Sequence, residues 1–271
     1  MPRLLRHLLR FRGLLLTLTQ RELKARYRGS TLGFFWSLVN PLALIVVYAF
    51  VFSTIFAPRD RFVVDYGPYG LFLACGVIPW IWLQTAWVEG TSSLTANSGL
   101  IRKAAFPAEL LPIVSVLANL VHLVLALPIL YAAFGVAHLL GVHVSFGWPA
   151  LLAPVVMLLQ LPLVAGLALG FAALHVHFKD VRDILGNLLT LLFFLTPILY
   201  TIETLRPFPP IYYAVKLNPL TPFLEGYQAT LFYGRVPDLA TWGMMLFVSA
   251  VVWALGAWIF DRLAETLGEA V

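Results

Sequence analysis

The residues best suited to chemistry form a basic cluster just before a long apolar run. They are Arg21, Lys24, Arg26 and Arg28. Guanidinium and ammonium groups suit phosphate oxygens by charge and hydrogen-bond geometry. The cluster ends in Gly-Ser-Thr, and an apolar run begins at Phe34. We interpret this junction as a membrane surface that meets a membrane span, with anionic lipids as one partner of the charges.

Glu89 is the clearest ionisable residue at the depth of an apolar run. Ionisable groups at such positions are candidates for function. Three alternatives remain open for its carboxylate: it reaches the membrane surface, it pairs with an arginine of the N-terminal segment, or it acts directly in transport. No apolar run contains the series of carboxylates expected of an ion-coupled carrier, which counts against that class.

Two histidines and two aspartates lie close together in the sequence: His175, His177, Asp180 and Asp183. They resemble a metal-ligand cluster, but side chains two residues apart diverge on a helix. We interpret the cluster as a polar turn between two apolar runs, and we expect no metal. His122, His138 and His143 are isolated in the sequence.

Several catalytic motifs are absent. No lysine follows a glycine, so the chain has no phosphate-binding loop of the Gly-Lys-Ser/Thr kind. The motifs HExxH and Gly-x-Ser-x-Gly are also missing. The one cysteine, Cys75, excludes an intramolecular disulfide and a cysteine-based zinc site. We therefore expect no nucleotide site and no cofactor on this chain, and no enzymatic activity of its own.

The composition shows which environment must position these residues. Of the 271 residues, 61% are hydrophobic and 11% are charged, and the mean hydropathy is +0.88. Soluble domains contain about 25% charged residues. Lipid is therefore the main solvent, and the continuous apolar runs indicate an all-α polytopic membrane protein, because an open sheet cannot satisfy its backbone in lipid. The net charge of +5 is concentrated near the N-terminus, where it indicates a membrane surface and not a nucleic acid.

Six apolar runs are long enough to cross a bilayer as helices. They cover residues 34–56, 69–94, 110–140, 148–175, 184–200 and 241–260. With these boundaries, the connections on the N-terminal side contain thirteen of the 18 Lys and Arg residues. The excess of positive charge predicts that both termini are cytoplasmic.

Two segments depart from plain spans. In residues 1–33, a helix over 8–28 is too polar to cross and should lie along the inner membrane surface. Its apolar stripe contains Leu14, Leu15, Leu18 and Leu23, and its basic side contains Arg21, Lys24 and Arg28. The proline-rich segment 201–240 contains apolar runs that are too short to cross, which predicts short re-entrant or interfacial helices.

A second basic segment lies between the second and third runs, at about residues 97–107. Asn97 or Ser98 can cap a short helix there, and Pro107 ends it. Its candidate contact residues are Leu100, Ile101, Arg102, Lys103 and Phe106. A resting place on the bilayer and a groove on a soluble partner are equally good interpretations.

Aromatic side chains in the first and fifth runs could line a pathway. They are Tyr48, Phe52, Phe193, Phe194 and Tyr200. If these two runs line a channel, their rings could stack on the apolar faces of sugars. Ordinary packing is the alternative.

Four segments, in this order along the chain, resemble membrane subunits of ABC-2 type polysaccharide exporters. They read RELKARYRGSTLGFFWSLVNPL, LIRKAAFPAELLP, FKDVRDILGNLLTLLFFLTPILY and LNPLTPFLEGYQATLFYG. Members of this family export O-antigen, capsular polysaccharide or teichoic acid. Together with the six runs, the resemblance covers most of the chain.

The resemblance implies a multi-pass subunit of the cytoplasmic (inner) membrane that forms a homodimer with two separate ATP-binding subunits. ATP and Mg would bind to those partners. Residues 34–271 would form the six-span domain, with the helix at 97–107 coupling it to the ATPase and residues 201–240 closing the extracytoplasmic end. Spans one and five of both subunits would line the channel.

The resemblance also implies a substrate: a polysaccharide on an undecaprenyl-pyrophosphate anchor. Arg21, Lys24, Arg26 and Arg28 are then candidates for contact with the lipid head group, and attraction to membrane lipids is the alternative. Two other functions are alternatives. One is an ABC-2 exporter of small hydrophobic drugs or lipids. The other is a lipid-linked glycosyltransferase, which requires clustered carboxylates that only Asp180 and Asp183 approach.

Overall fold

A computed structural model describes residues 2–31, 33–51, 63, 65–103 and 106–270. Across these residues the chain is built of helices, and no strand occurs among them. The predicted all-α class is confirmed. The channel candidate Phe52 lies outside the described residues.

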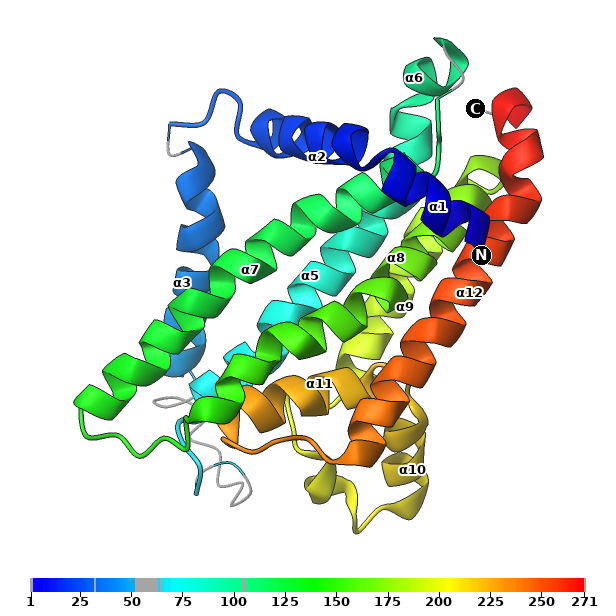
Figure 1. Ribbon diagram of the computed structural model, residues 1–271. Coiled ribbons are helices and arrows are strands. Elements are labelled where there is room, and N and C mark those ends of the chain that lie inside the picture. The colour runs from blue at the N-terminus through cyan, green and yellow to red at the C-terminus, as the bar shows by residue number, and fades with distance from the viewer. Residues whose placement is uncertain (1, 32, 52–62, 64, 104–105, 271) are drawn as a thin grey trace.

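Four long helices form the centre of the molecule (Figure 1). They are α5 (Tyr69–Ala96), α7 (Leu110–Leu139), α8 (Ala153–His177), which follows the 3₁₀ turn η3 (Trp148–Leu152), and α12 (Leu239–Ala270). In the described part of the chain, the stretches long and apolar enough to cross a membrane are Tyr69–Ala96, Leu110–Leu139, Trp148–His177 and Leu239–Ala264. These correspond to the second, third, fourth and sixth predicted runs, although α12 continues beyond residue 260.

Of the other two runs, the fifth forms a shorter helix, and residues 52–56 of the first lie outside the described residues. The turn η1 (Gly33–Phe35) leads into α3 (Trp36–Phe50), and α9 covers Val181–Leu195. The predicted boundaries 184–200 of the fifth run were wrong at both ends. The helix stops at Leu195 because Thr196 precedes Pro197 and is extended, with φ −106° and ψ 140°, as is typical of a residue before proline.

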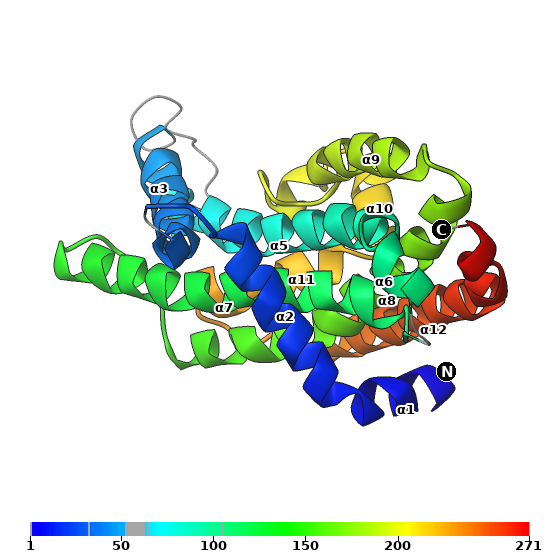
Figure 2. The ribbon, with the colours of Figure 1, turned by 90° about the horizontal axis from the view of Figure 1, so that it is seen from above.

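The N-terminal segment lies across one end of the bundle (Figures 1 and 2). It forms two helices, α1 (Pro2–Arg10) and α2 (Arg12–Arg26), separated at Phe11. The prediction of a single helix over 8–28 was wrong in this respect. Of the predicted apolar stripe, Leu18 is buried and Leu14 is exposed. On the predicted basic side, Arg28 lies beyond the end of α2. The side of α2 that packs on the bundle is therefore narrower than the sequence indicated.

The proline-rich segment 201–240 lies at the opposite end of the bundle from α2 (Figure 1). It contains η4 (Ile202–Leu205), α10 (Pro209–Leu217), α11 (Thr221–Tyr227) and the π-helical turn η5 (Gln228–Phe232). Its buried polar side chains bond to the bundle. Gln228 Nε2 donates to Pro197 O at 2.7 Å, and Tyr227 Oη donates to Gln160 Oε1 at 3.0 Å. These bonds fix the short helices against α8 and the end of α9.

Helices α8 and α12 approach each other closely through glycines. A Cβ atom added to Gly166 would lie 2.6 Å from Trp253 Cα, and one added to Gly256 would lie 2.9 Å from Gly166 Cα. Real Cβ atoms essentially never approach other heavy atoms below 3.0 Å. Small residues allow membrane helices to pack backbone against backbone, so this contact requires glycine at both positions.

Candidate functional site

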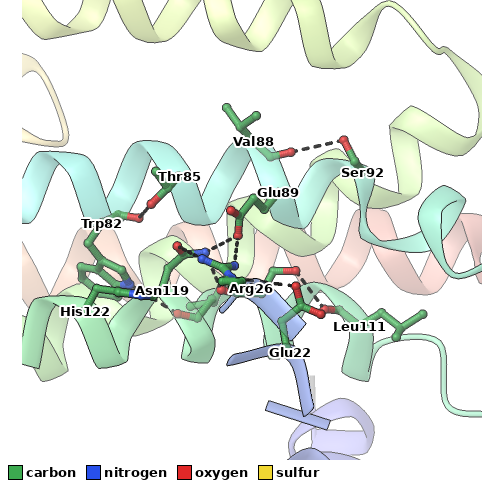
Figure 3. A network of polar contacts seen from close by, with 12 residues as sticks. Glu22, Arg26, Trp82, Thr85, Val88, Glu89, Ser92, Leu111, Asn119 and His122 are labelled. Carbon is green, nitrogen blue, oxygen red and sulfur yellow. Dashed lines mark hydrogen bonds and ion pairs between the residues drawn. The ribbon is translucent and has the colours of Figure 1, made fainter. Parts of the chain in front are cut away.

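Arg26 joins three helices at the end of the bundle that α2 crosses (Figure 3). From the last turn of α2, its guanidinium forms an ion pair with Glu89 of α5 and donates to Asn119 Oδ1 of α7 at 2.9 Å. Asn119 Nδ2 in turn donates to Glu89 Oε2 at 2.6 Å. Glu22 Oε1 is 3.9 Å from Arg26 Nε, one helical turn away. The charges of Arg26 and Glu89 thus compensate each other where α2 meets the bundle.

Tyr27 and His122 form a second bond beside this network. The distance between Tyr27 Oη and His122 Nε2 is 2.5 Å. His122, which is isolated in the sequence, therefore has a hydrogen-bond partner in the fold. Asn119 and His122 are three residues apart and share one face of α7, and this spacing is the one sequence signal that could have grouped them.

A cavity of about 310 Å³ opens beside the network, between the end of α2 and helices α3, α5 and α7. Arg26, Glu89 and Asn119 form its polar end. Its other walls are mainly apolar, from Leu44, Ile78 and Leu123 among others. The cavity therefore suits an amphiphilic group with a polar head and an apolar tail better than a fully polar ligand.

The four basic candidates of the N-terminal segment do not share one site. Arg26 is turned into the bundle, whereas Arg21, Lys24 and Arg28 are exposed. Of the three alternatives for Glu89, the structure contains the pairing with an arginine of the N-terminal segment. Asn119, Tyr27 and His122 complete the site, and sequence analysis did not include them.

The surface helix α6 (Ser98–Lys103) is shorter than the predicted 97–107. Asn97 directly precedes it, and its side-chain Nδ2 donates to Ser93 O at 2.9 Å. Phe106 lies outside the helix, and it packs with Ile101 against the hydrophobic core. Leu100 is half-buried and is not part of those core contacts. Arg102 and Lys103 form the last turn of α6, which projects from the same end of the molecule as α1 and α2 (Figure 1).

The aromatic candidates of the fifth run form one group. The Phe193 ring lies edge-on to Trp80 at a centroid distance of 5.8 Å, and the Phe194 ring lies 5.3 Å from Phe193. Tyr200 Oη donates to Phe194 O at 2.9 Å. Tyr48 lies on α3 and packs partly against the core. Phe194 remains 60% exposed and is the member of this group best placed to face a pathway.

The predicted polar turn from His175 to Asp183 is shorter than expected: His175 and His177 lie in the last turn of α8, Asp183 lies in the first turn of α9, and only residues 178–180 connect the two helices. His175 is buried, and His177 Nδ1 lies 3.0 Å from Ala173 O. In the part of the chain that the structure describes, no three His, Cys, Asp or Glu side chains are grouped as metal ligands.

The helical bundle, with its surface helices at one end and its short helices at the other, defines a multi-pass membrane protein. The chain belongs to the ABC-2 type transporter family, whose family model matches residues 13–232. It is a membrane subunit of this class and has no Gly-Lys-Ser/Thr loop.

Relatives with the same name come from two organisms. The chain is 37% identical over 276 residues to the "O-antigen export system permease protein RfbA" of Myxococcus xanthus, covering 100% of both chains. It is 26% identical over 256 residues to a protein of the same name from Klebsiella pneumoniae, covering 94% of both. A second protein of that name from Klebsiella pneumoniae is also 26% identical over 256 residues.

Proposed function

We propose that this chain is the permease subunit of an ATP-driven exporter that moves an O-antigen-like polysaccharide across the inner membrane. The observation that carries the proposal is the 37% identity to an O-antigen export permease over the full length of both chains. The absence of a phosphate-binding loop agrees with a subunit powered by a separate ATPase.

The arrangement of the helices supports six spans with both termini in the cytoplasm. Helices α1, α2 and α6 and the C-terminal end of α12 lie at one end of the bundle (Figure 1). Thirteen of the 18 Lys and Arg residues belong to the segments assigned to this end, which is therefore the cytoplasmic one. Helices α3 and α9 complete the six spans.

Two copies of the chain and two ATPase subunits form the working complex in this proposal. The exposed apolar faces of α3 and α9, which include Val47, Phe50, Leu191 and Phe194, face the channel between the copies or the surrounding lipid. The projecting helix α6 contacts the ATPase subunit in this proposal. ATP and Mg bind to that ATPase subunit.

The cavity beside Arg26 supports a lipid-linked substrate. Its polar end and apolar walls fit an amphiphile. The exposed Arg21, Lys24 and Arg28 do not line the cavity, but they lie on the same N-terminal segment as Arg26, and their charges suit the pyrophosphate of an undecaprenyl anchor. Arg26 itself is neutralised by Glu89, so its function is to hold α2 in place and to offer a hydrogen-bond donor.

Reconstitution tests the function directly. The chain and its ATPase subunit are placed in vesicles that contain radiolabelled lipid-linked O-antigen on the outer leaflet. We expect ATP-dependent transfer of the polymer into the lumen, where added glycosidase cannot reach it. If the vesicles accumulate a small amphiphilic dye and no polymer, the chain is an exporter of small hydrophobic molecules and the proposal is wrong.

The role of α6 leads to a separate prediction. Leu100→Asp places a charge on the helix that would bind the ATPase. We expect ATPase activity in the assembled complex to fall about tenfold, because an uncompensated buried charge at an interface costs about 2 kcal/mol or more. The measurement is phosphate release by purified complexes of equal subunit content. Leu217→Asp, at an exposed position of α10 at the opposite end of the bundle, is the control. Equal ATPase activity in the Leu100 variant and the wild type would remove α6 from the contact.

A further inference from the structure

The proline-rich segment 201–240, called the outer segment from here on, lines an open cavity at the far end of the bundle from Arg26. It measures about 510 Å³, and its walls come from η4, α10, α11, η5 and the start of α12. These elements are grouped at the lower end of Figure 1. The volume falls within the range of about 300–1,000 Å³ that is typical of small-molecule sites.

Charges of both signs line this outer cavity. Its bases are Arg206, Lys216 and Arg235, and its acids are Glu203, Glu225 and Asp238. Among the described residues, no N–O distance of 4.0 Å or less joins one of these bases to one of these acids. Both kinds of group are therefore available to a ligand, and the bases and acids are equal in number, so neither kind dominates the lining of the cavity.

Aromatic and backbone contacts hold several of these groups in position. Lys216 Nζ lies 5.5 Å from the centroid of the Tyr212 ring. The guanidinium carbon of Arg235 lies 4.9 Å from the centroid of the Tyr233 ring. Asp238 Oδ1 accepts a hydrogen bond from the backbone nitrogen of Thr241 at 3.0 Å. Lys216 and Arg235 are thus held over ring faces before a ligand arrives.

Glu225 is the most enclosed of the acids. It lies half-buried on α11 and lines the cavity. Burial, followed by repulsion from Glu203, raises the pKa of its carboxyl to about 7, with a smaller increase from Asp238, while Lys216 and Arg235 act in the opposite direction. Near neutral pH this carboxyl can both donate and accept hydrogen bonds.

A hydroxyl group fits between such charges, because it donates to a carboxylate and accepts from an ammonium or guanidinium at the same time. Acyl chains are a poor fit for walls that contain six charged groups. We propose that the outer cavity binds a saccharide, a ring with several hydroxyls, as one unit of the polymer that leaves the membrane. This inference rests on the proposed export function and adds to it a binding site on the extracytoplasmic side.

The test measures binding of lipid-free polysaccharide to the complete complex in nanodiscs of phosphatidylethanolamine and phosphatidylglycerol. The probe is the O-antigen polymer released from its lipid by mild acid, and the method is isothermal titration calorimetry. We expect Kd to rise about tenfold in Glu225→Gln and in Lys216→Met, the loss expected for one charge-assisted hydrogen bond. Asp65→Asn, an exposed acid that does not line the cavity, should leave Kd unchanged.

Four outcomes would overturn the inference. Equal Kd values for wild type and both variants would place any saccharide elsewhere. If the variants lose bound phosphatidylethanolamine in native mass spectrometry and keep their affinity for polymer, the cavity is a lipid head-group site. If wild type binds no polymer but exports it in the vesicle assay, only this inference fails. If wild type exports no polymer in that assay, the proposed function fails with it.

Discussion

Gly256→Leu is expected to prevent stable folding of the helical bundle. Even the first atom of the new side chain would lie 2.9 Å from Gly166 Cα, and backbone atoms of α8 cannot move aside as a flexible side chain would. Overpacking in a core costs about 1–3 kcal/mol, and a clash with backbone exceeds that range. The expected loss of more than about 3 kcal/mol is a large part of the 5–15 kcal/mol that stabilise a typical domain.

The measurement is thermal unfolding of the purified chain in detergent, together with the yield of monodisperse protein. Gly243→Leu is the matched control, because it lies on the same helix and an added Cβ there meets nothing within 4 Å. The control should unfold near the wild-type temperature. A wild-type unfolding temperature for Gly256→Leu would show that α8 and α12 do not pack through these glycines.

Glu89→Lys is expected to release α2 from the bundle and to reduce export strongly. The substitution replaces the carboxylate that Arg26 and Asn119 both contact, and it places two cations side by side. Removing one partner of a partly buried pair and adding a like charge should cost about 2–3 kcal/mol. Amide hydrogen exchange of residues 12–26, followed by mass spectrometry, should become faster in the variant.

A matched control separates the ion pair from charge alone. Glu22→Lys introduces the same charge change next to Arg26. The Glu22 carboxylate contacts Arg26 more weakly than Glu89 does, because its Oε1 lies 3.9 Å from Arg26 Nε. We expect its exchange pattern to stay close to wild type. The double variant Arg26→Glu with Glu89→Arg should recover part of the protection. Slow exchange in Glu89→Lys would mean that the ion pair does not hold α2.

The long helices could be predicted from the sequence because each contains a continuous apolar run that must satisfy its own backbone. The starts of α5 and α7, at Tyr69 and Leu110, agree with the predicted ones. The end of α9 was predicted poorly, although Pro197 was visible in the sequence, because apolar composition alone continues to Tyr200. Composition determines where a helix can cross, whereas local stereochemistry determines where it stops.

The polar network around Arg26 and Glu89 could be predicted only in part. Glu89 and the N-terminal arginines were visible as a possible pair, because a charge in an apolar run needs a partner. Asn119 and His122 were not, since their places beside Glu89 and Tyr27 depend on how α5 and α7 align along their lengths. That alignment is a property of three-dimensional packing and leaves no local pattern in the sequence.

The glycine contact between α8 and α12 also bears on how the chain is assembled during synthesis. Helix α8 leaves the ribosome well before α12, because α9 and the whole outer segment lie between them in the sequence. Until α12 is inserted, the face of α8 at Gly166 and Gly170 has only lipid or the insertion machinery against it. Nascent chains that stop before α12 therefore expose an unfinished surface, which membrane quality control could recognise, and the bundle closes only when α12 arrives.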